Sequence, residues 1–502
     1  MATRHKKKLG NYLGKYSVNN NSVVGKLKLR GASTVLRLYS GDEVLPFQDA
    51  DAQMIRGCAY SSECLTLVDC CFHGEGRNVR EDGSETSWLD TFPHYVVVGN
   101  SFIDPHECEI YSIRFTLTDS GVLFNDSQAF GHVIDSKSVI DAVLEGARKY
   151  REVQTGEHPY VFYYTGKQEI VEVVTDLGRV SVTHRPNFSP GTTAGISVEN
   201  RIVVSIEPLK PIAFDDAVER MYTVATFFSV AAGRAQGIDN IEILVTTGVV
   251  KKTRALAVHP SFQWKVKGKD EGFKPHVGDL PLDPVSRPSE FGKVLSNWVS
   301  RHAGWRTARS RYLECIRRAN KFGVDRLVAA ANMFDILPLD VDSAGSAVSS
   351  ELSAAVAETK SLFRKLPKSA ERNSVLDALG RLGKPSLPKK VHARVKIIDD
   401  QLAWAFPDLH MAAIVAIKYR NYFVHGSSSD LDIEKLEPFL PFLTNLLEFI
   451  FSVSDFIEAG WDALSWSKSD FGSGHSFSRF RREYLPALGE LKVAIAKDKG
   501  EE

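Results

Sequence analysis

The sequence predicts an α+β protein of two domains: a β-rich N-terminal domain with packed helices, followed by an all-α C-terminal helical bundle. Three observations predict this class. The chain has 502 residues, more than one hydrophobic core usually supports. Its first part alternates short β-branched and aromatic runs with turn residues, and its second part carries helical periodicity. Between them, residues 265–288 hold four prolines and no periodicity. We therefore place a β-rich domain at 1–280 and a helical domain at 285–502.

Strand-like runs separated by Gly, Asn, Asp and Pro dominate the first domain. The expected strands are 33–39, 95–98, 109–117, 160–164, 179–184 and 201–206. Two helices are expected among them. One covers 138–150, and the other covers 215–232, where Val218, Met221, Ala225 and Phe228 recur at helical spacing.

The second domain is predicted to be helical throughout. The expected helices are 290–302, 310–337, 351–366, 370–382, 391–404, 408–425 and 436–459, with a small polar loop at 340–350. Residues 301–400 contain 19 Lys and Arg against 11 Asp and Glu, a surplus of 8 positive charges. A solvated helical surface explains this surplus as well as a nucleic-acid-binding face does.

Composition and missing motifs exclude several classes of protein. Lys and Arg total 62 and Asp and Glu total 62, so a basic coat for nucleic acid is excluded but a local basic groove is not. The six cysteines include no C-x-x-C pair, which indicates reduced thiols and a cytoplasmic protein. No apolar run reaches the ~18–20 residues of a membrane span. The P-loop, dinucleotide-binding, HExxH, GxSxG and kinase motifs are absent, as are paired carboxylates at metal-site spacing, so we expect no metal and no cofactor.

One motif with chemical meaning remains, an Arg and a His separated by four residues at Arg420 and His425. Comparable pairs occur at Arg179–His184, Arg254–His259 and Arg151–His158. The first two lie in extended sequence, where an offset of five puts the side chains on opposite faces of a strand. The third straddles a turn at 155–156. Only Arg420 and His425 lie on a predicted helix.

That helix, 408–425, is apolar almost all round and is therefore expected at the centre of a bundle. Lys418, Arg420, Asn421 and His425 form a polar group at its C-terminal end. On an ideal helix Arg420 lies about 140° from His425, and its long side chain can reach round. The alternative is that these cations only compensate the helix dipole.

The pair Arg420 and His425 matches R-x4-H, the motif of HEPN ribonucleases, and the helical half resembles a HEPN domain. The first half carries Gly25–Leu29, the run 33–39, and a later helix followed by Ile241–Val245. It resembles the N-terminal domain of ApeA-type proteins, which are bacterial anti-phage abortive-infection proteins. The resemblance implies a metal-independent endoribonuclease joined to an N-terminal sensing or regulatory domain. It also implies an acid from an earlier helix, for which Asp335 is the first candidate and Glu314 the second.

In this chemistry the RNA 2′-OH is the nucleophile. A neutral His425 removes its proton, Arg420 stabilises the charge that develops on the phosphate, and Asn421 orients His425 or the phosphate. The resemblance implies a homodimer or higher homo-oligomer through the helical domain, with two Arg/His pairs facing one cleft. The other expected partners are RNA, such as tRNA or another structured cellular RNA, and a phage-derived trigger or inhibitor.

The residues expected to bind RNA are Lys418, Arg479, Arg481 and Arg482. The last three lie in 475–484, where cations alternate with aromatic residues. The alternative for this segment is a C-terminal helix whose aromatic residues pack inward. Two rivals to the nuclease remain at this point. One is a catalytically silent HEPN scaffold that binds RNA or protein, and the other is a sensor whose β-rich half is the main active part.

Overall fold

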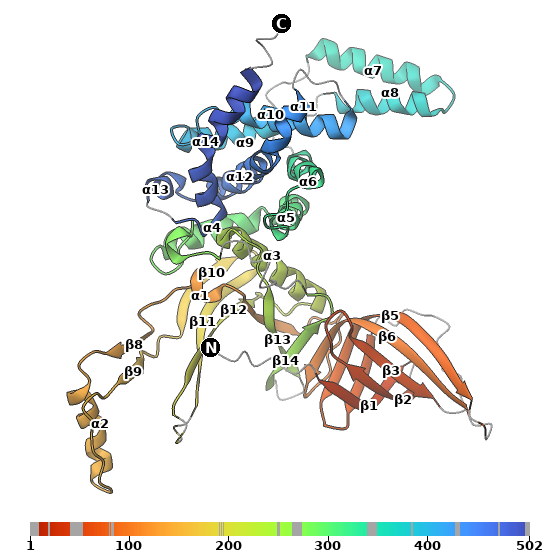
Figure 1. Ribbon diagram of the computed structural model, residues 1–502. Coiled ribbons are helices and arrows are strands. Elements are labelled where there is room, and N and C mark those ends of the chain that lie inside the picture. Colours follow the sequence, from red (N-terminus) through yellow and green to blue (C-terminus); the bar gives the residue numbers. More distant parts are fainter. Residues whose placement is uncertain are drawn as a thin grey trace. The chain divides into compact units, whose positions relative to one another are not determined.

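The computed structural model describes residues 10–496 except 19–20, 41–53, 80, 82–84, 190, 192, 194, 248–251, 264–273, 339–348, 383–384, 427–431 and 470–471. The chain forms two compact units. Unit 1 contains residues 1–271 and 282–299, and unit 2 contains residues 272–281 and 300–502. Unit 1 is β-rich and unit 2 is helical (Figure 1), so the predicted fold class is confirmed. Nearly all of the loop expected at 340–350 lies outside the described residues.

Unit 1 contains all fourteen named strands. Its strands are β1 (Asn11–Val18), β2 (Asn21–Lys28), β3 (Val35–Ser40), β4 (Met54–Ala59), β5 (Cys64–Val79), β6 (Glu85–Gly99), β7 (Ile110–Leu117), β8 (Phe130–Val133), β9 (Val161–Tyr164), β10 (Glu169–Thr175), β11 (Gly178–Phe188), β12 (Val198–Glu207), β13 (Ile238–Thr247) and β14 (Lys252–Pro260). Its helices are α1 (Ser120–Leu123), α2 (Lys137–Arg148), α3 (Phe214–Ala232) and α4 (Pro288–Ser300).

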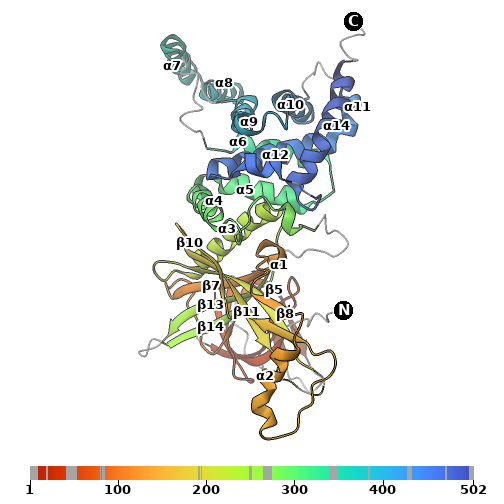
Figure 2. The same ribbon diagram turned by 90° about the vertical axis from the view of Figure 1, so that its left-hand side faces the viewer.

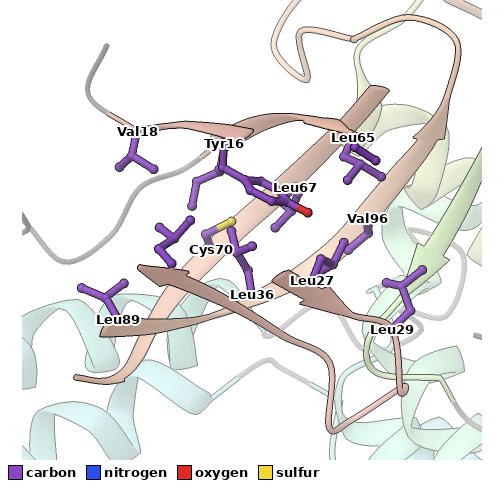
Figure 3. Close-up of a cluster of buried hydrophobic side chains, with 13 residues drawn as sticks. Tyr16, Val18, Leu27, Leu29, Leu36, Leu65, Leu67, Cys70, Leu89 and Val96 are labelled. Carbon is purple, nitrogen blue, oxygen red and sulfur yellow. The ribbon is translucent and has the colours of Figure 1, made fainter. Parts of the chain in front are cut away.

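Six strands of unit 1 close into a barrel. The ring runs β6-β3-β2-β1-β4-β5 and returns to β6, because the long strands β5 and β6 pair from Cys64↔Gly99 to Val79↔Glu85. Buried side chains fill its interior (Figure 3), among them Tyr16, Leu27, Leu36, Leu67 and Val96. A Cβ at Gly57 would lie 2.4 Å from the Tyr16 ring, so glycine is required there. The interior is thus a packed core.

The second half of β6 also pairs with β14, from which an open sheet continues in the order β14-β13-β7-β12-β11-β10. The mostly buried helix α3 packs on the strand β7 of this sheet. Phe227 of α3 contacts Phe291 and Trp298 of α4, with ring centroids 5.9 and 5.5 Å apart. Helix α4, which the sequence placed in the helical domain, is therefore part of the core of unit 1.

Unit 2 is a helical bundle around one long apolar helix. Its elements are η1 (Val277–Asp279), α5 (His302–Arg317), α6 (Val324–Asp335), α7 (Ser350–Lys365), α8 (Ala370–Arg381), α9 (Leu387–Leu402), α10 (Leu409–His425), α11 (Ile433–Leu436), η3 (Glu437–Phe439), α12 (Leu440–Ala459), α13 (Ala463–Lys468) and α14 (Ser476–Ala496). Figure 2 shows α12 amid its neighbours α5, α6, α9 and α14. Within the described residues, the stretch Ile433–Ala459 has the length and composition of a membrane span, but 72% of the apolar window is buried, as in the core helix of a globular bundle.

One expected helix is wrong. The sequence predicted a single helix over 310–337, whereas the chain forms α5 and α6 with a turn between them. Ala319 adopts a left-handed conformation with φ +48°. Arg326 holds the turn, since its Nη1 donates to the carbonyls of Ala319 at 2.5 Å and Lys321 at 3.2 Å. These contacts close a turn that the helical periodicity does not reveal.

Candidate ribonuclease site

The candidate site lies at the C-terminal end of α10, where a buried helix reaches the surface. Most of α10 is buried, and this includes Arg420, of which only 8% is exposed. The next turn emerges, so that His425 is exposed and Gly426 ends the helix in a left-handed conformation with φ +62°. A fixed cation therefore lies next to an accessible imidazole.

Three neighbouring side chains hold the Arg420 guanidinium. Nη1 donates to Oδ1 of Asn421 at 3.0 Å, and Nη2 donates to Oδ1 of Asn332 on α6 at 2.6 Å. The Asp335 carboxylate, one turn further along α6, lies 3.7 Å from Nη2. Arg420 Nε is buried and has no hydrogen-bond partner among the described residues. The guanidinium is thus oriented by two helices rather than by its own helix alone.

His425 completes the group. Its Nε2 lies 3.5 Å from Arg420 Nη1. The guanidinium can only donate, so Nε2 is the atom placed to accept in this contact. The structure thus brings together Arg420, Asn421, His425 and Asp335. Asn421 was expected to orient His425 or the phosphate, and in the structure its carbonyl oxygen accepts from Arg420.

Helix α6 is held firmly where it supplies these partners. At its first turn, Arg326 forms two hydrogen bonds to the Glu448 carboxylate of α12, at 2.7 and 2.9 Å, and both side chains are buried. At its last turn, Lys390 Nζ of α9 donates to the carbonyls of Asp335 at 2.5 Å and Leu337 at 3.1 Å. Burial lowers the pKa of Lys390, which the nearby Asp335 carboxylate partly opposes. These contacts fix the position of Asn332 and Asp335.

Sequence reasoning missed Asn332. It lies three residues before Asp335, which is the helical spacing that puts both side chains on one face, and this was the available signal. The alternative acid, Glu314, is placed elsewhere. It forms an ion pair with Arg317 on its own helix α5, and its side chain is 64% exposed.

The residues expected to bind RNA are dispersed. Lys418 is exposed on α10, two residues before Arg420. Arg479 donates to the carbonyls of Ser473 and Gly474 at 3.2 and 3.1 Å, and burial lowers its pKa. Arg481 lies over the Trp466 ring at 5.6 Å. Arg482 is exposed and donates to Ser473 Oγ at 3.0 Å.

The aromatic residues of the same segment are in the core. Phe477, Phe480 and Tyr484 are buried on α14, where Tyr484 Oη donates to the Pro407 carbonyl at 2.7 Å. The alternative interpretation, an inward-packed C-terminal helix, is confirmed for these side chains. They are not available to stack on bases.

The other Arg–His pairs have structural partners or extended geometry. Arg179 and His184 lie on β11, where Arg179 pairs with Glu207 and Glu172. His184 is buried, contacts Asn200 through Nδ1 at 2.9 Å, and lies 3.6 Å from Asp126. Arg254 and His259 lie on β14, as expected from their extended sequence. Across the described part of the chain, no three His, Cys, Asp or Glu side chains are grouped to hold a metal ion.

Comparison with known proteins agrees with the division into a β-rich unit 1 and a helical unit 2. The family model for ApeA N-terminal domain 1 matches residues 11–298, a range that covers α4 up to residue 298. The model for the Apea-like HEPN domain matches residues 328–464, a range that covers α6 from residue 328 and all of α10. No curated protein and no solved structure gives a significant match. HEPN domains are usually ribonucleases, and the pairing with an ApeA domain is of the defence type. The chain belongs to the ApeA family, with an ApeA N-terminal domain followed by an Apea-like HEPN domain.

Proposed function

We propose that this chain is a metal-independent HEPN endoribonuclease of a bacterial anti-phage abortive-infection system, with Arg420 and His425 as catalytic residues. One observation carries the proposal. The buried, oriented guanidinium of Arg420 lies 3.5 Å from Nε2 of the exposed residue His425, at the end of one helix. Both belong to the matched HEPN range.

The geometry suits transfer of a phosphoryl group within RNA. His425 places Nε2 beside the guanidinium, and a neutral imidazole whose proton is on Nδ1 accepts the 2′-OH proton there as general base. A phosphate bound against His425 would accept from Arg420 Nη1, which stabilises the charge developing on its oxygens. Asn332, Asn421 and Asp335 are positioning residues, because they act through the guanidinium. The products would carry a 2′,3′-cyclic phosphate and a 5′-OH.

A second Arg/His pair is proposed to come from another copy of the chain. One histidine cannot readily accept a proton from the nucleophile and deliver one to the leaving oxygen on the opposite side of the phosphorus. Beside the site, Tyr422, Phe423 and Val424 are 40%, 39% and 41% exposed. Large apolar side chains grouped at the surface are typical of association faces. They support a homodimer in which two α10 ends face each other.

The N-terminal region is proposed to sense or regulate rather than catalyse. Its barrel is filled by apolar side chains, and it contains no Arg/His pair on a helix among its described residues. A phage-derived trigger or inhibitor is the proposed ligand, and structured cellular RNA such as tRNA is the proposed substrate.

The test is cleavage of RNA by the purified full-length chain in excess EDTA, followed by analysis of the product ends. We expect 2′,3′-cyclic phosphate ends, no cleavage of DNA, and no cleavage where the 2′-OH is replaced by hydrogen. Arg420→Ala and His425→Ala should each lower the rate at least ~100-fold while the protein stays folded. Full activity of His425→Ala would refute the proposal, and so would 5′-phosphate ends that need Mg²⁺. A silent scaffold would show RNA binding without cleavage.

A further inference from the structure

Helices α7 and α8 form a hairpin that extends away from the other helices of unit 2 (Figures 1 and 2). Neither helix contains a buried residue among those whose burial is described. The two helices pack against each other, and their half-buried residues include Phe363, Val375 and Leu379. Because the two helices bury so little apolar surface, they contribute little to the stability of unit 2. This indicates that the hairpin has a functional role and is not part of the core.

The turn of this hairpin is strongly basic. Residues 360–372 contain Lys360, Arg364, Lys365, Lys368 and Arg372 but one acid, Glu371. Arg372 has a structural task, since it donates to the carbonyls of Phe363 at 2.8 Å and Arg364 at 3.2 Å and so closes the end of α7. In a chain of zero net charge, this is a local concentration of positive charge.

Three of the cations at the turn are exposed and unpaired. Arg364, Lys365 and Lys368 form no ion pair or hydrogen bond through their side chains with any other residue in the described ranges. Pairing within the protein therefore does not account for them. Groups of this kind are available to bind the phosphates of a nucleic acid.

The hairpin connects two helices, α6 and α9, that lie at the candidate site. The chain enters it after α6, which carries Asn332 and Asp335, and leaves it into α9, where Lys390 Nζ donates to the Asp335 carbonyl at 2.5 Å. Helix α8 has 12 residues. At 1.5 Å per residue, the basic turn before Ala370 lies about 18 Å from the other end of α8 at Arg381. This distance is longer than a dinucleotide.

We propose that the α7–α8 hairpin binds the phosphate backbone of the substrate RNA, several nucleotides from the cleaved bond, through Arg364, Lys365 and Lys368. This inference rests on the proposed ribonuclease function. It predicts that the chain selects long or structured RNA over short fragments. The hairpin contributes affinity, and the Arg420/His425 group contributes the chemistry.

The test compares the full-length triple variant Arg364→Gln/Lys365→Gln/Lys368→Gln with a control of equal charge change, Lys137→Gln/Lys149→Gln/Arg151→Gln, which alters exposed cations of unit 1. Binding of tRNA is measured on the inactive His425→Ala background at several salt concentrations. The logarithm of the association constant falls as the logarithm of the salt concentration rises. The loss of three phosphate contacts should make this slope less steep by about 2. The control should keep the original slope.

Cleavage is then measured on the active background. The hairpin variant should show at least ~10-fold higher KM for tRNA with unchanged kcat, and unchanged turnover of the dinucleotide UpA. Affinity and salt slope equal to those of the control would overturn the hairpin assignment even if cleavage is normal. If the wild-type chain cuts no RNA but the salt slope still falls, the ribonuclease proposal fails and the hairpin stands as an RNA-binding element.

Discussion

Arg420 of α10 and Asn332 of α6 are joined by a 2.6 Å hydrogen bond, although they lie 88 residues apart in the chain. Asn332 accepts from the same guanidinium that faces His425. We expect Asn332→Ala to lower RNA cleavage by about 10-fold, because Arg420 loses one of its two amide partners. The effect should appear in kcat, and the melting temperature should change little. Asn187→Ala, on the strand β11 of unit 1, is the control. An unchanged kcat would show that Asn332 does not position Arg420.

The two candidate acids can be separated by isosteric substitutions. Asp335 lies 3.7 Å from Arg420 Nη2, whereas Glu314 pairs with Arg317. Asp335→Asn removes the charge beside the guanidinium and should reduce cleavage several-fold. Glu314→Gln serves as the matched control and should leave the rate unchanged. Equal loss in both variants would contradict the structural assignment of the acid.

Dimerisation through the end of α10 predicts a concentration dependence. Phe423→Glu places a charge on the exposed apolar surface beside His425 and should shift the protein towards monomer in analytical ultracentrifugation. Cleavage per chain should fall in parallel, most strongly at low protein concentration. Leu485→Glu, at an exposed apolar residue of α14, is the control. A monomer that retains full activity at high dilution would exclude the two-copy site.

The sequence predicted the local parts of this protein better than its long-range parts. Helix α10 and its polar end were predictable, because an apolar helix that ends in Lys418, Arg420, Asn421 and His425 is a local pattern. The closure of the barrel was not, because it depends on strand register over the long pair β5–β6. Asn332 was missed because its role appears only when α6 meets α10.

The domain boundary illustrates the same limit. The proline-rich segment suggested one clean linker, but residues 272–281 belong to unit 2 and residues 282–299 to unit 1. Asp279 accepts from the Gly474 amide at 2.8 Å, and Trp461 Nε1 donates to the Pro281 carbonyl at 2.8 Å. A fragment that begins at residue 285 would lose these contacts and carry α4 without its α3 partner. Point variants of the full chain are therefore better tests of regulation than truncations.

The buried pair Arg326–Glu448 should be essential to the stability of unit 2. Arg326→Met leaves the Glu448 carboxylate buried without its partner, which typically costs about 3–5 kcal/mol. The double variant Arg326→Met/Glu448→Leu removes both charges and should recover most of that loss. Urea unfolding of the three proteins measures the difference. If Arg326→Met is as stable as the double variant, the unpaired Glu448 carboxylate does not destabilise the protein, and this prediction is wrong.

The last prediction concerns pH and His302, at the start of α5. Burial lowers the pKa of His302 to about 4, and Arg309 and Arg306 lower it further, while Asp455 opposes them. In the unfolded chain a histidine titrates near ~6.5. Between these two values the unfolded chain binds a proton that the folded chain does not, so stability should decrease as the pH falls through this window.

The His302 contribution is fully present above pH ~6.5 and is lost by pH ~4. Because the side chain is partly exposed, solvent screening reduces the effect to about 1–2 kcal/mol. His302→Gln removes this titration. The free energy of unfolding should therefore fall more for the wild type than for this variant between pH 7 and pH 4. The difference between the two proteins should change by about 1–2 kcal/mol, in favour of the variant at low pH. His132→Gln, at an exposed histidine, is the control for the loss of an imidazole. A constant difference for His302→Gln would show that the native environment does not depress its protonation.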